Sequence, residues 1–159
     1  MTSVAALLRA RFAGRHAGGA PTAFATTVDY ADHAGFESRA RRITGPAYGS
    51  GGLRLQMRAL LAIVAASLCE PVLLLDSSAG SLHPDVLACA VIGALPRSRR
   101  ARVVLMGCMW ECSPGWRGRI ERLVVRAADR GVDRYALQTT DELRTFPSTW
   151  GVPPGKLRF

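Results

Sequence analysis

The stretch VLLLDSSAGSLHPDVLACAVIGALPRSRRARVVLM, residues 72–106, alternates strand and helix signals. It begins with the apolar run 72–75, which Asp76 closes and which is typical of a strand buried on both sides. Pro84 can occupy the first position of the helix that follows. A second apolar run, 102–106, then repeats the strand signal. Two strands joined by a helix at this spacing indicate a βαβ unit with parallel strands.

The same alternation continues on both sides of this unit. Upstream, residues 23–28 are a strand candidate, and a glycine-rich loop at 45–52 precedes a helical apolar pattern that Pro71 must end. Downstream, the sequence predicts a helix over 116–130, a strand over 134–138 and a last strand over 156–159. Between these two strands it predicts a short helix that begins at a capping box of Thr139 and Glu142 and is limited by Pro147. The predicted class is α/β, with a Rossmann-like, open, mainly parallel sheet and helices on both faces.

Apolar spacing also predicts which side of each helix faces the core. Residues three or four positions apart share one helix face, so a periodic apolar stripe is expected to point inward. In the helix before Pro71 this stripe consists of Leu53, Met57, Leu60, Leu61, Val64 and Leu68. In the helix over 116–130 it consists of Ile120, Leu123, Val124, Ala127 and Ala128.

Length and composition fit one globular unit. The chain has 159 residues, of which 48% are hydrophobic and 21% are charged, and this supplies a sizeable core. We assign residues 1–22 to an N-terminal segment and linker, and residues 23–159 to a single Rossmann-like domain. The longest apolar run, residues 59–69, is shorter than the roughly 20 residues of a membrane-spanning helix, so no such helix is predicted.

The formal net charge of +9 comes almost entirely from arginine, since Lys156 is the only lysine among 21 basic residues. A positive surface attracts nucleic acids and anionic membranes alike. No nucleic-acid recognition motif accompanies the charge, so the sequence predicts no specific nucleic-acid partner. An anionic membrane surface is the other partner to consider, and the residues predicted to face it, opposite the apolar stripe of their helix, are Arg119, Arg122, Arg126 and Arg130.

Cysteine usage and loop chemistry give no signal for a metal or a cofactor. Four cysteines in a chain with this much core predict reduced thiols and a cytoplasmic protein. Cys108 and Cys112 form a C-x3-C pattern without a nearby histidine or second cysteine pair, so no metal site is predicted. The loop at 45–52 has neither the P-loop lysine nor the dinucleotide fingerprint, so no nucleotide cofactor is predicted.

In an open parallel sheet, ligands collect beyond the carboxyl ends of the strands, and three predicted loops lie there. The loop at 76–83 contributes Asp76 and His83 as candidate catalytic groups, and the loop at 107–112 contributes Glu111. Helix capping is the alternative role for Asp76 and His83. The mixture of polar groups suits a hydroxyl-rich ligand such as a sugar. Candidate ligand-binding residues, including those of the third loop at 138–142, are Ser77, Ser78, Trp110, Thr139, Thr140 and Glu142.

The C-terminal segment VDRYALQTTDELRTFPSTWGVPPGKLRF, residues 132–159, resembles a stretch of the GT-B glycosyltransferases, especially those similar to family 4. In that family a strand of this type leads to a short helix and then to a tryptophan-glycine turn. Residues 70–78 and 101–110 fall where the family has two further strands, so the resemblance covers about residues 53–159. The matching C-terminal positions are Asp133, Arg134, Tyr135, Thr139, Glu142, Trp150, Gly151, Val152, Pro153, Lys156 and Phe159.

This resemblance implies the acceptor-side half of a two-domain enzyme that transfers a sugar from a nucleotide-sugar donor. The family's donor contacts lie mostly in a C-terminal domain that this sequence does not include. The implied partners are therefore a donor-binding domain or subunit and a sugar acceptor, and the isolated chain is expected to be inactive. An exposed apolar patch is expected around Trp150, Val152 and Phe159, where the second domain would pack.

The sequence also departs from the family pattern. Thr139 or Thr140 replaces the usual serine after the strand, and the family's opening strand with its glycine-rich loop is not clear in the first 50 residues. Two alternative interpretations therefore stay open: a non-catalytic Rossmann-like binding or scaffold module, and a small stand-alone enzyme on a flavodoxin-like sheet.

Overall fold

The computed structural model describes residues 24–27, 40–43, 52–108 and 110–158. Six strands form one sheet in the order β2-β1-β3-β4-β5-β6, and every neighbouring pair is parallel. The open, parallel α/β sheet is thus confirmed, whereas the predicted N-terminal segment 1–22 lies outside the described residues. The strands are β1 (Phe24–Thr26), β2 (Ala40–Arg42), β3 (Val72–Asp76), β4 (Arg102–Met106), β5 (Arg134–Ala136) and β6 (Leu157–Arg158).

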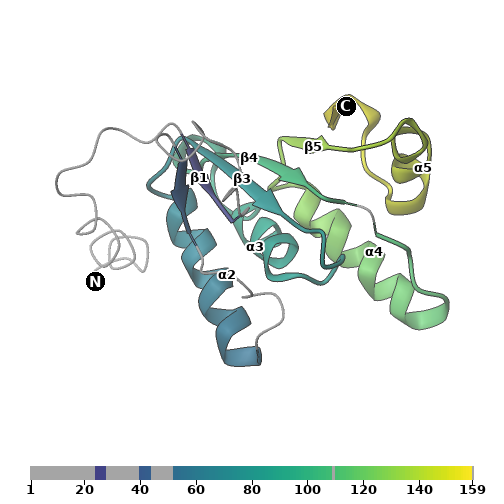
Figure 1. Ribbon diagram of the computed structural model, residues 1–159, viewed down its shortest axis with the longest axis horizontal. Coiled ribbons are helices and arrows are strands. Elements are labelled where there is room, and N and C mark those ends of the chain that lie inside the picture. The colour runs from purple at the N-terminus through teal and green to yellow at the C-terminus, as the bar shows by residue number, and fades with distance from the viewer. Residues whose placement is uncertain (1–23, 28–39, 44–51, 109, 159) are drawn as a thin grey trace.

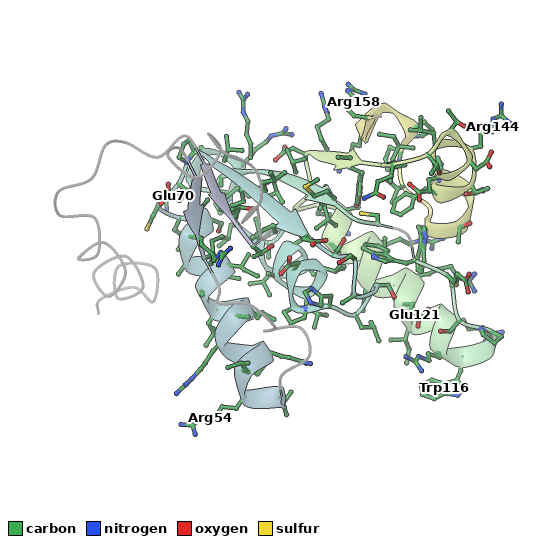
Figure 2. All side chains as sticks on the ribbon, viewed as in Figure 1. Arg54, Glu70, Trp116, Glu121, Arg144 and Arg158 are labelled. Atoms are coloured by element: carbon green, nitrogen blue, oxygen red, sulfur yellow. The ribbon has the colours of Figure 1, made fainter. Side chains whose placement is uncertain are left out.

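In the described residues, helices cover one face of this sheet (Figure 1), whereas the sequence predicts helices on both faces. They are α2 (Leu53–Ser67), α3 (Pro84–Ile92), α4 (Gly115–Asp129) and α5 (Thr140–Trp150). Helices α2, α3 and α4 lie side by side with α3 in the middle, and α5 lies at the β5 end of the sheet (Figure 1). Arg54 and Trp116 mark the ends of α2 and α4 that project away from the sheet (Figure 2). Among the described helices, none has both the length and the apolar content needed to cross a bilayer.

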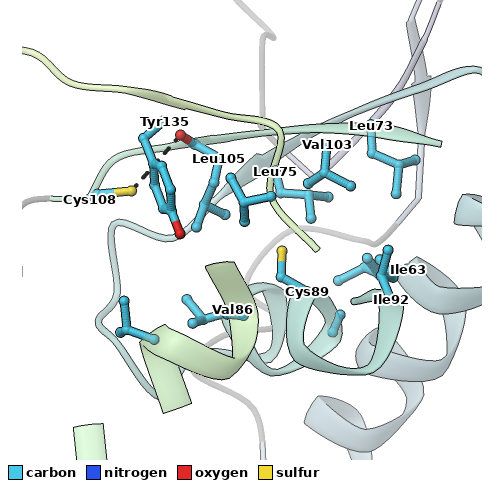
Figure 3. Packing of buried hydrophobic residues seen from close by; sticks show 14 of the residues in the cluster. Ile63, Leu73, Leu75, Val86, Cys89, Ile92, Val103, Leu105, Cys108 and Tyr135 are labelled. Atoms are coloured by element: carbon cyan, nitrogen blue, oxygen red, sulfur yellow. Dashed lines mark hydrogen bonds between the residues drawn. The ribbon is translucent and has the colours of Figure 1, made fainter. Parts of the chain in front are cut away.

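The core fills the space between the sheet and these helices. Leu73, Leu75, Val103 and Leu105 point from β3 and β4 toward the helices and are fully buried (Figure 3). Their helical neighbours in the cluster include Ile63, Val86, Cys89 and Ile92. The alternate residues of β3 are only half-buried, so this strand is completely covered on one face, not on both as its apolar run suggested.

The apolar stripes predicted for α2 and α4 face this core only in part: Val64 and Ala128 are buried, and Leu60 and Val124 pack against the core. Leu53, Met57, Leu61, Ile120 and Leu123 are all exposed, which contradicts their assignment to the inner faces. Small or hydrogen-bonded residues take the inner positions instead. In α2 these are chiefly Ala59, Ile63, Ala66 and Ser67, next to the correctly predicted Val64; in α4 they are Gly118, Glu121, Val125 and the correctly predicted Ala128.

A loop that folds back over the first turns of α4 explains this difference. A Cβ atom on Gly118 would lie only 1.9 Å from the carbonyl oxygen of Ser113, so no larger residue fits there. Glu121 accepts hydrogen bonds from the amide and the hydroxyl of Ser113, at 2.9 and 2.7 Å. Glycine and a paired glutamate can therefore line the inner face of α4, and periodicity alone does not reveal such a face.

The C-terminal elements differ from prediction in two ways. Helix α5 continues through Pro147 to Trp150, and Gly151 then ends it in the left-handed conformation with φ of 72°. Trp150 and Val152 are 1% and 3% exposed, so the exposed apolar patch expected around them is absent from the described residues, and Phe159 lies outside these. Trp150 and Phe146 pack against Trp110, and this burial holds the last turn of α5 despite the proline.

Candidate functional site

A polar hollow of about 440 Å³ lies at the carboxyl ends of β3 and β4. The loops after these two strands form its floor and one wall, and the first turns of α4 and a residue of α2 complete it. Its lining includes Gln56, Ser78, His83, Trp110, Glu111 and Arg117. The hollow thus occupies the edge where parallel sheets bind ligands, as the sequence predicts.

Two hydrogen-bonding groups of Ser77 fix these loops to each other. The amide and hydroxyl of Ser77 both donate to the carbonyl oxygen of Met106, at 3.0 and 2.9 Å. The Ser77 carbonyl in turn accepts the indole N–H of Trp110 at 2.7 Å. Since Ser77 is also fully buried, a ligand cannot reach its side chain. We therefore correct the prediction that Ser77 binds a ligand: this residue positions Trp110.

Asp76 serves the same local structure. Its Oδ1 accepts the amide of Ser78 at 2.9 Å, which closes the turn after β3. Gly107, with φ of 71°, allows the loop after β4 to approach, because a Cβ atom there would lie 2.5 Å from this oxygen. Asp76 therefore stabilises the turn after β3 and does not cap a helix, since the N-cap position of α3 is His83. Asp76 is also not among the residues that line the hollow.

A buried carboxylate lies beneath the hollow, near the point where the strand order reverses between β1 and β3. The hydroxyl of Thr27 donates to Asp85 at 2.7 Å and accepts the amide of Asp76 at 2.9 Å. Asp85 is fully buried in the first turn of α3. The pattern in the sequence does not reveal this link, because 58 residues separate Thr27 from Asp85.

His83 lines the hollow directly above this carboxylate. It is the N-cap residue of α3, although its side chain makes no capping hydrogen bond, and its Nδ1 lies 3.8 Å from Oδ1 of Asp85. Burial lowers the pKa of His83 below its ordinary value of 6.5, and the Asp76 carboxylate opposes this effect only in part. The imidazole is therefore neutral at neutral pH, the form that accepts a proton.

This lowered pKa makes stability depend on pH. The unfolded chain binds more protons than the folded chain at pH values below about 6.5, so the free energy of unfolding should fall as the pH decreases from there. His83→Gln should remove this part of the slope while leaving the rest of the profile in place. Urea unfolding of both proteins across this pH range measures the effect, and identical slopes would contradict it.

Glu111 is the accessible carboxylate of the site. It is exposed and lines the main hollow, and it also lines a second hollow of about 230 Å³ between the loop after β4 and α5. Trp110 borders both hollows and packs edge-on against Trp150, with 5.6 Å between ring centroids. The Trp110–Glu111 pair therefore lies between the polar main hollow and a second hollow that is lined by both aromatic and polar residues.

Glu121 lines the main hollow, but its carboxylate is engaged with neighbouring residues. The Ser113 amide is the main cause of its lowered pKa, and Nε of Arg117 lies 3.3 Å from it. Arg117 itself stays exposed at the rim. The sequence analysis missed Gln56, Arg117 and Glu121, because only the packing of α2 and α4 brings these helices to the loops.

The third predicted loop contributes less than expected. Thr139 and Glu142 form the predicted capping box, and Glu142 also accepts the amide of Gln138 at 2.8 Å. Glu142 lines the second hollow, whereas Thr139 and Thr140 line neither of the two hollows described here. The threonines of this loop are thus helix-start residues, and their assignment to a ligand has no support from their position.

The arginines of α4 are spread over its outer surface. Arg119, Arg126 and Arg130 are exposed, and Arg122 is half-buried. Arg126 packs beside the end of α5, since a Cβ atom on Gly151 would lie 2.9 Å from its Nε. The four residues therefore remain candidates for contact with an anionic surface.

The main hollow can bind and polarise a hydroxylated ligand. A serine hydroxyl, an amide and a guanidinium supply hydrogen bonds, and an imidazole and a carboxylate can each accept a proton. Within the described part of the chain, no three histidine, cysteine, aspartate or glutamate side chains gather into a group able to hold a metal ion. Comparison with family models, with curated proteins and with solved structures finds no significant match to this chain.

Proposed function

We propose that this chain is the acceptor-side domain of a glycosyltransferase that uses a nucleotide-sugar donor and works with a separate donor-binding domain or subunit. We place it in the cytoplasm, because its four cysteines are free thiols and suit a reducing compartment. The resemblance of residues 132–159 to GT-B enzymes favours this function. The observation that carries it is the polar hollow at the carboxyl edge of the sheet.

In this proposal the hollow holds the acceptor hydroxyl. Ser78 and Arg117 bind the sugar or other polar acceptor, and Trp110 supplies an apolar wall. Glu111 and the neutral His83 are the two groups able to receive the proton that the acceptor hydroxyl loses when it attacks the donor sugar. Asp76, Ser77 and Thr27 hold the loops in place and do not touch the acceptor.

The donor must bind elsewhere. The leaving nucleoside diphosphate carries negative charge, and its stabilisation needs positioned cations or amide groups. Among the described residues that line the hollow, Arg117 is the arginine, and it already pairs with Glu121. Steady turnover of a nucleotide sugar by the pure 159-residue chain would therefore contradict the proposal that the donor binds to a separate domain or subunit.

Reconstitution tests the proposal directly. The chain is combined with a donor-binding domain encoded beside it, and transfer from a radiolabelled nucleotide sugar to methyl glycosides is measured. Glu111→Gln should lower kcat about tenfold or more, because it removes a proton acceptor from the hollow. Asp141→Asn makes the same type of change at an exposed position of α5 outside both hollows, and transfer should stay unchanged. Equal losses in both variants, or no transfer in any combination, would overturn the proposal.

A non-catalytic binding module is the second candidate, and one observation favours it. Several predicted site residues, namely Asp76, Ser77, Thr139 and Glu142, make hydrogen bonds that stabilise the loops or helix ends. A binding module needs only the hollow and no proton acceptor. In that case Glu111→Gln would weaken the binding of methyl glycosides, while no donor-binding domain would restore transfer.

A further inference from the structure

The exposed apolar side chains of this protein gather on its helical layer. Every exposed large hydrophobic residue that the structure describes lies on α2, α3, α4 or the loop leading into α3. None lies on the strands or on α5. Single exposed leucines are ordinary on a protein surface, but such a concentration marks a contact surface. These residues are Leu53, Leu55, Met57, Leu61, Leu82, Val91, Trp116, Ile120 and Leu123.

Two ordered stripes stand out among them. On α4, Trp116, Ile120 and Leu123 are spaced by four and three residues, share one helix face, and are 75%, 42% and 65% exposed. On α2, Leu53, Met57 and Leu61 repeat every fourth residue. The core-facing side of each helix is formed by other residues, so both stripes point outward.

The stripes flank the main hollow. Gln56, between Leu55 and Met57 on α2, and Arg117, next to Trp116 on α4, both line it. The free ends of the two helices, marked by Arg54 and Trp116, project toward the same side of the molecule (Figure 2). Helix α3 lies between them, so the stripes form two separate apolar ridges on either side of a polar opening.

The exposed charges beside the apolar stripes on α2 and α4 are arginines, and the exposed carboxylate of Glu111 lies in the polar opening between the ridges. Arg54 and Arg58 on α2 and Arg119 on α4 are exposed beside the stripes. The acidic residues of α2, α3 and α4 do not oppose them: Asp85 and Glu121 are buried, and Asp129 pairs with Lys156 at 3.0 Å. Among the described residues, the outer surface of these three helices therefore presents apolar groups and a net positive charge.

We propose that the two ridges, which we call the α2/α4 face, seat the protein on an anionic lipid surface. Apolar stripes flanked by arginine, with a tryptophan at the helix end, have the composition of helices that lie in a membrane interface. The arginines attract lipid phosphates, while Trp116, Ile120 and Leu123 enter the boundary between headgroups and acyl chains. A bilayer surface is fluid and contacts both ridges at once, whereas a protein partner would have to match two ridges and the polar opening between them.

This inference does not depend on the proposed transferase activity, because it concerns the outer face of the helices. It implies that the hollow opens close to the lipid headgroups. Part of the binding to the lipid surface should also persist at high salt, since ions do not screen the contribution of the apolar side chains.

Vesicle binding tests the α2/α4 face with the purified chain. Trp116 is the exposed tryptophan, while Trp110 and Trp150 are buried, so a change in tryptophan emission reports Trp116. With vesicles of phosphatidylcholine and phosphatidylglycerol we expect a blue shift, quenching by brominated acyl chains, and partial retention at high salt. Phosphatidylcholine alone should bind more weakly. An absence of binding, or binding without acyl-chain quenching, would overturn the proposal.

Matched variants separate the contribution of the arginines from that of the apolar side chains. The variant Arg54→Gln/Arg58→Gln/Arg119→Gln should lower affinity for the anionic vesicles by about 100-fold at low salt. The control Arg102→Gln/Arg144→Gln/Arg158→Gln removes the same charge from exposed positions on β4, α5 and β6, and affinity should change less than about threefold. Arg144 and Arg158 lie far from Trp116 in Figure 2. Equal losses in the two variants would contradict a specific face.

The apolar contribution has its own variant, Ile120→Ser/Leu123→Ser, which keeps Trp116 as the reporter. It should reduce vesicle affinity roughly tenfold and abolish the salt-resistant part of the binding. Both side chains are exposed, so the circular dichroism spectrum and the thermal transition should stay close to wild type. Unchanged, salt-resistant vesicle binding in this variant would overturn the role of the α4 stripe.

Discussion

Trp110→Ala is expected to lower the free energy of unfolding by about 3–5 kcal/mol, the typical cost of deleting a buried tryptophan side chain. Trp110 is 9% exposed and packs against Phe146 and Trp150, with ring centroids 5.8 and 5.6 Å away. The same substitution removes a wall that both hollows share. Urea unfolding measures the stability, and a cost below about 1 kcal/mol would show that the aromatic cluster does not hold the loop after β4.

Trp110→Phe is the matched control for the hydrogen bond of this residue. It keeps an aromatic ring in the cluster but leaves the buried carbonyl of Ser77 without the indole N–H that lies 2.7 Å away. An unpaired buried acceptor costs about 1–3 kcal/mol, so the loss should be clearly smaller than in Trp110→Ala. Equal losses in the two variants would assign the whole effect to the N–H group.

Leu105→Ala is expected to cost about 2–5 kcal/mol, because Leu105 is fully buried at the centre of the sheet, opposite Leu75 and Tyr135 in the strand register. Leu123→Ala is the matched control, with the same chemical change on α4 at a side chain that is 65% exposed. This second variant should cost about 0.5 kcal/mol or less. Chemical denaturation of both proteins tests the orientation of α4, and a large loss in Leu123→Ala would contradict it.

The strands were predictable because their signal is local. The apolar runs at 72–75 and 102–106 became β3 and β4 with ends that differ by at most one residue. Strand β2 gave no such signal, since its sequence Ala-Arg-Arg lacks an apolar run. Its pairing with β1 is a long-range property of the sheet.

Helix orientation was less predictable, and α4 shows the physical reason. Its apolar stripe at 120 and 123 is exposed, while Gly118 and Glu121 face the interior. Periodicity locates an apolar face but does not say whether protein or another surface covers it. The inner face of α4 depends on Ser113, which lies outside the helix and donates to Glu121.

The site was predictable at the level of loops but not of individual side chains. The loops after β3 and β4 do form the hollow, and His83 and Glu111 do line it. The roles of Asp76 and Ser77 depend on contacts with residues distant in sequence, such as the bond from Ser77 to Met106, 29 positions away. A single sequence does not show which hydroxyl or carboxylate groups are engaged in such internal hydrogen bonds and which are left to bind a ligand.

Amide chemical-shift mapping tests the central claim most directly, namely that the hollow at the carboxyl edge binds the acceptor. The 15N-labelled chain is titrated with methyl glycosides of glucose, mannose and galactose, and separately with uridine diphosphate. We expect a methyl glycoside to change the amide chemical shifts of Ser78, His83 and Glu111 selectively, and these changes should be smaller in Glu111→Gln. Uridine diphosphate should leave the same chemical shifts unchanged. Shifts confined to the opposite edge of the sheet around Arg97–Arg99, or no shifts with any glycoside, would contradict the account.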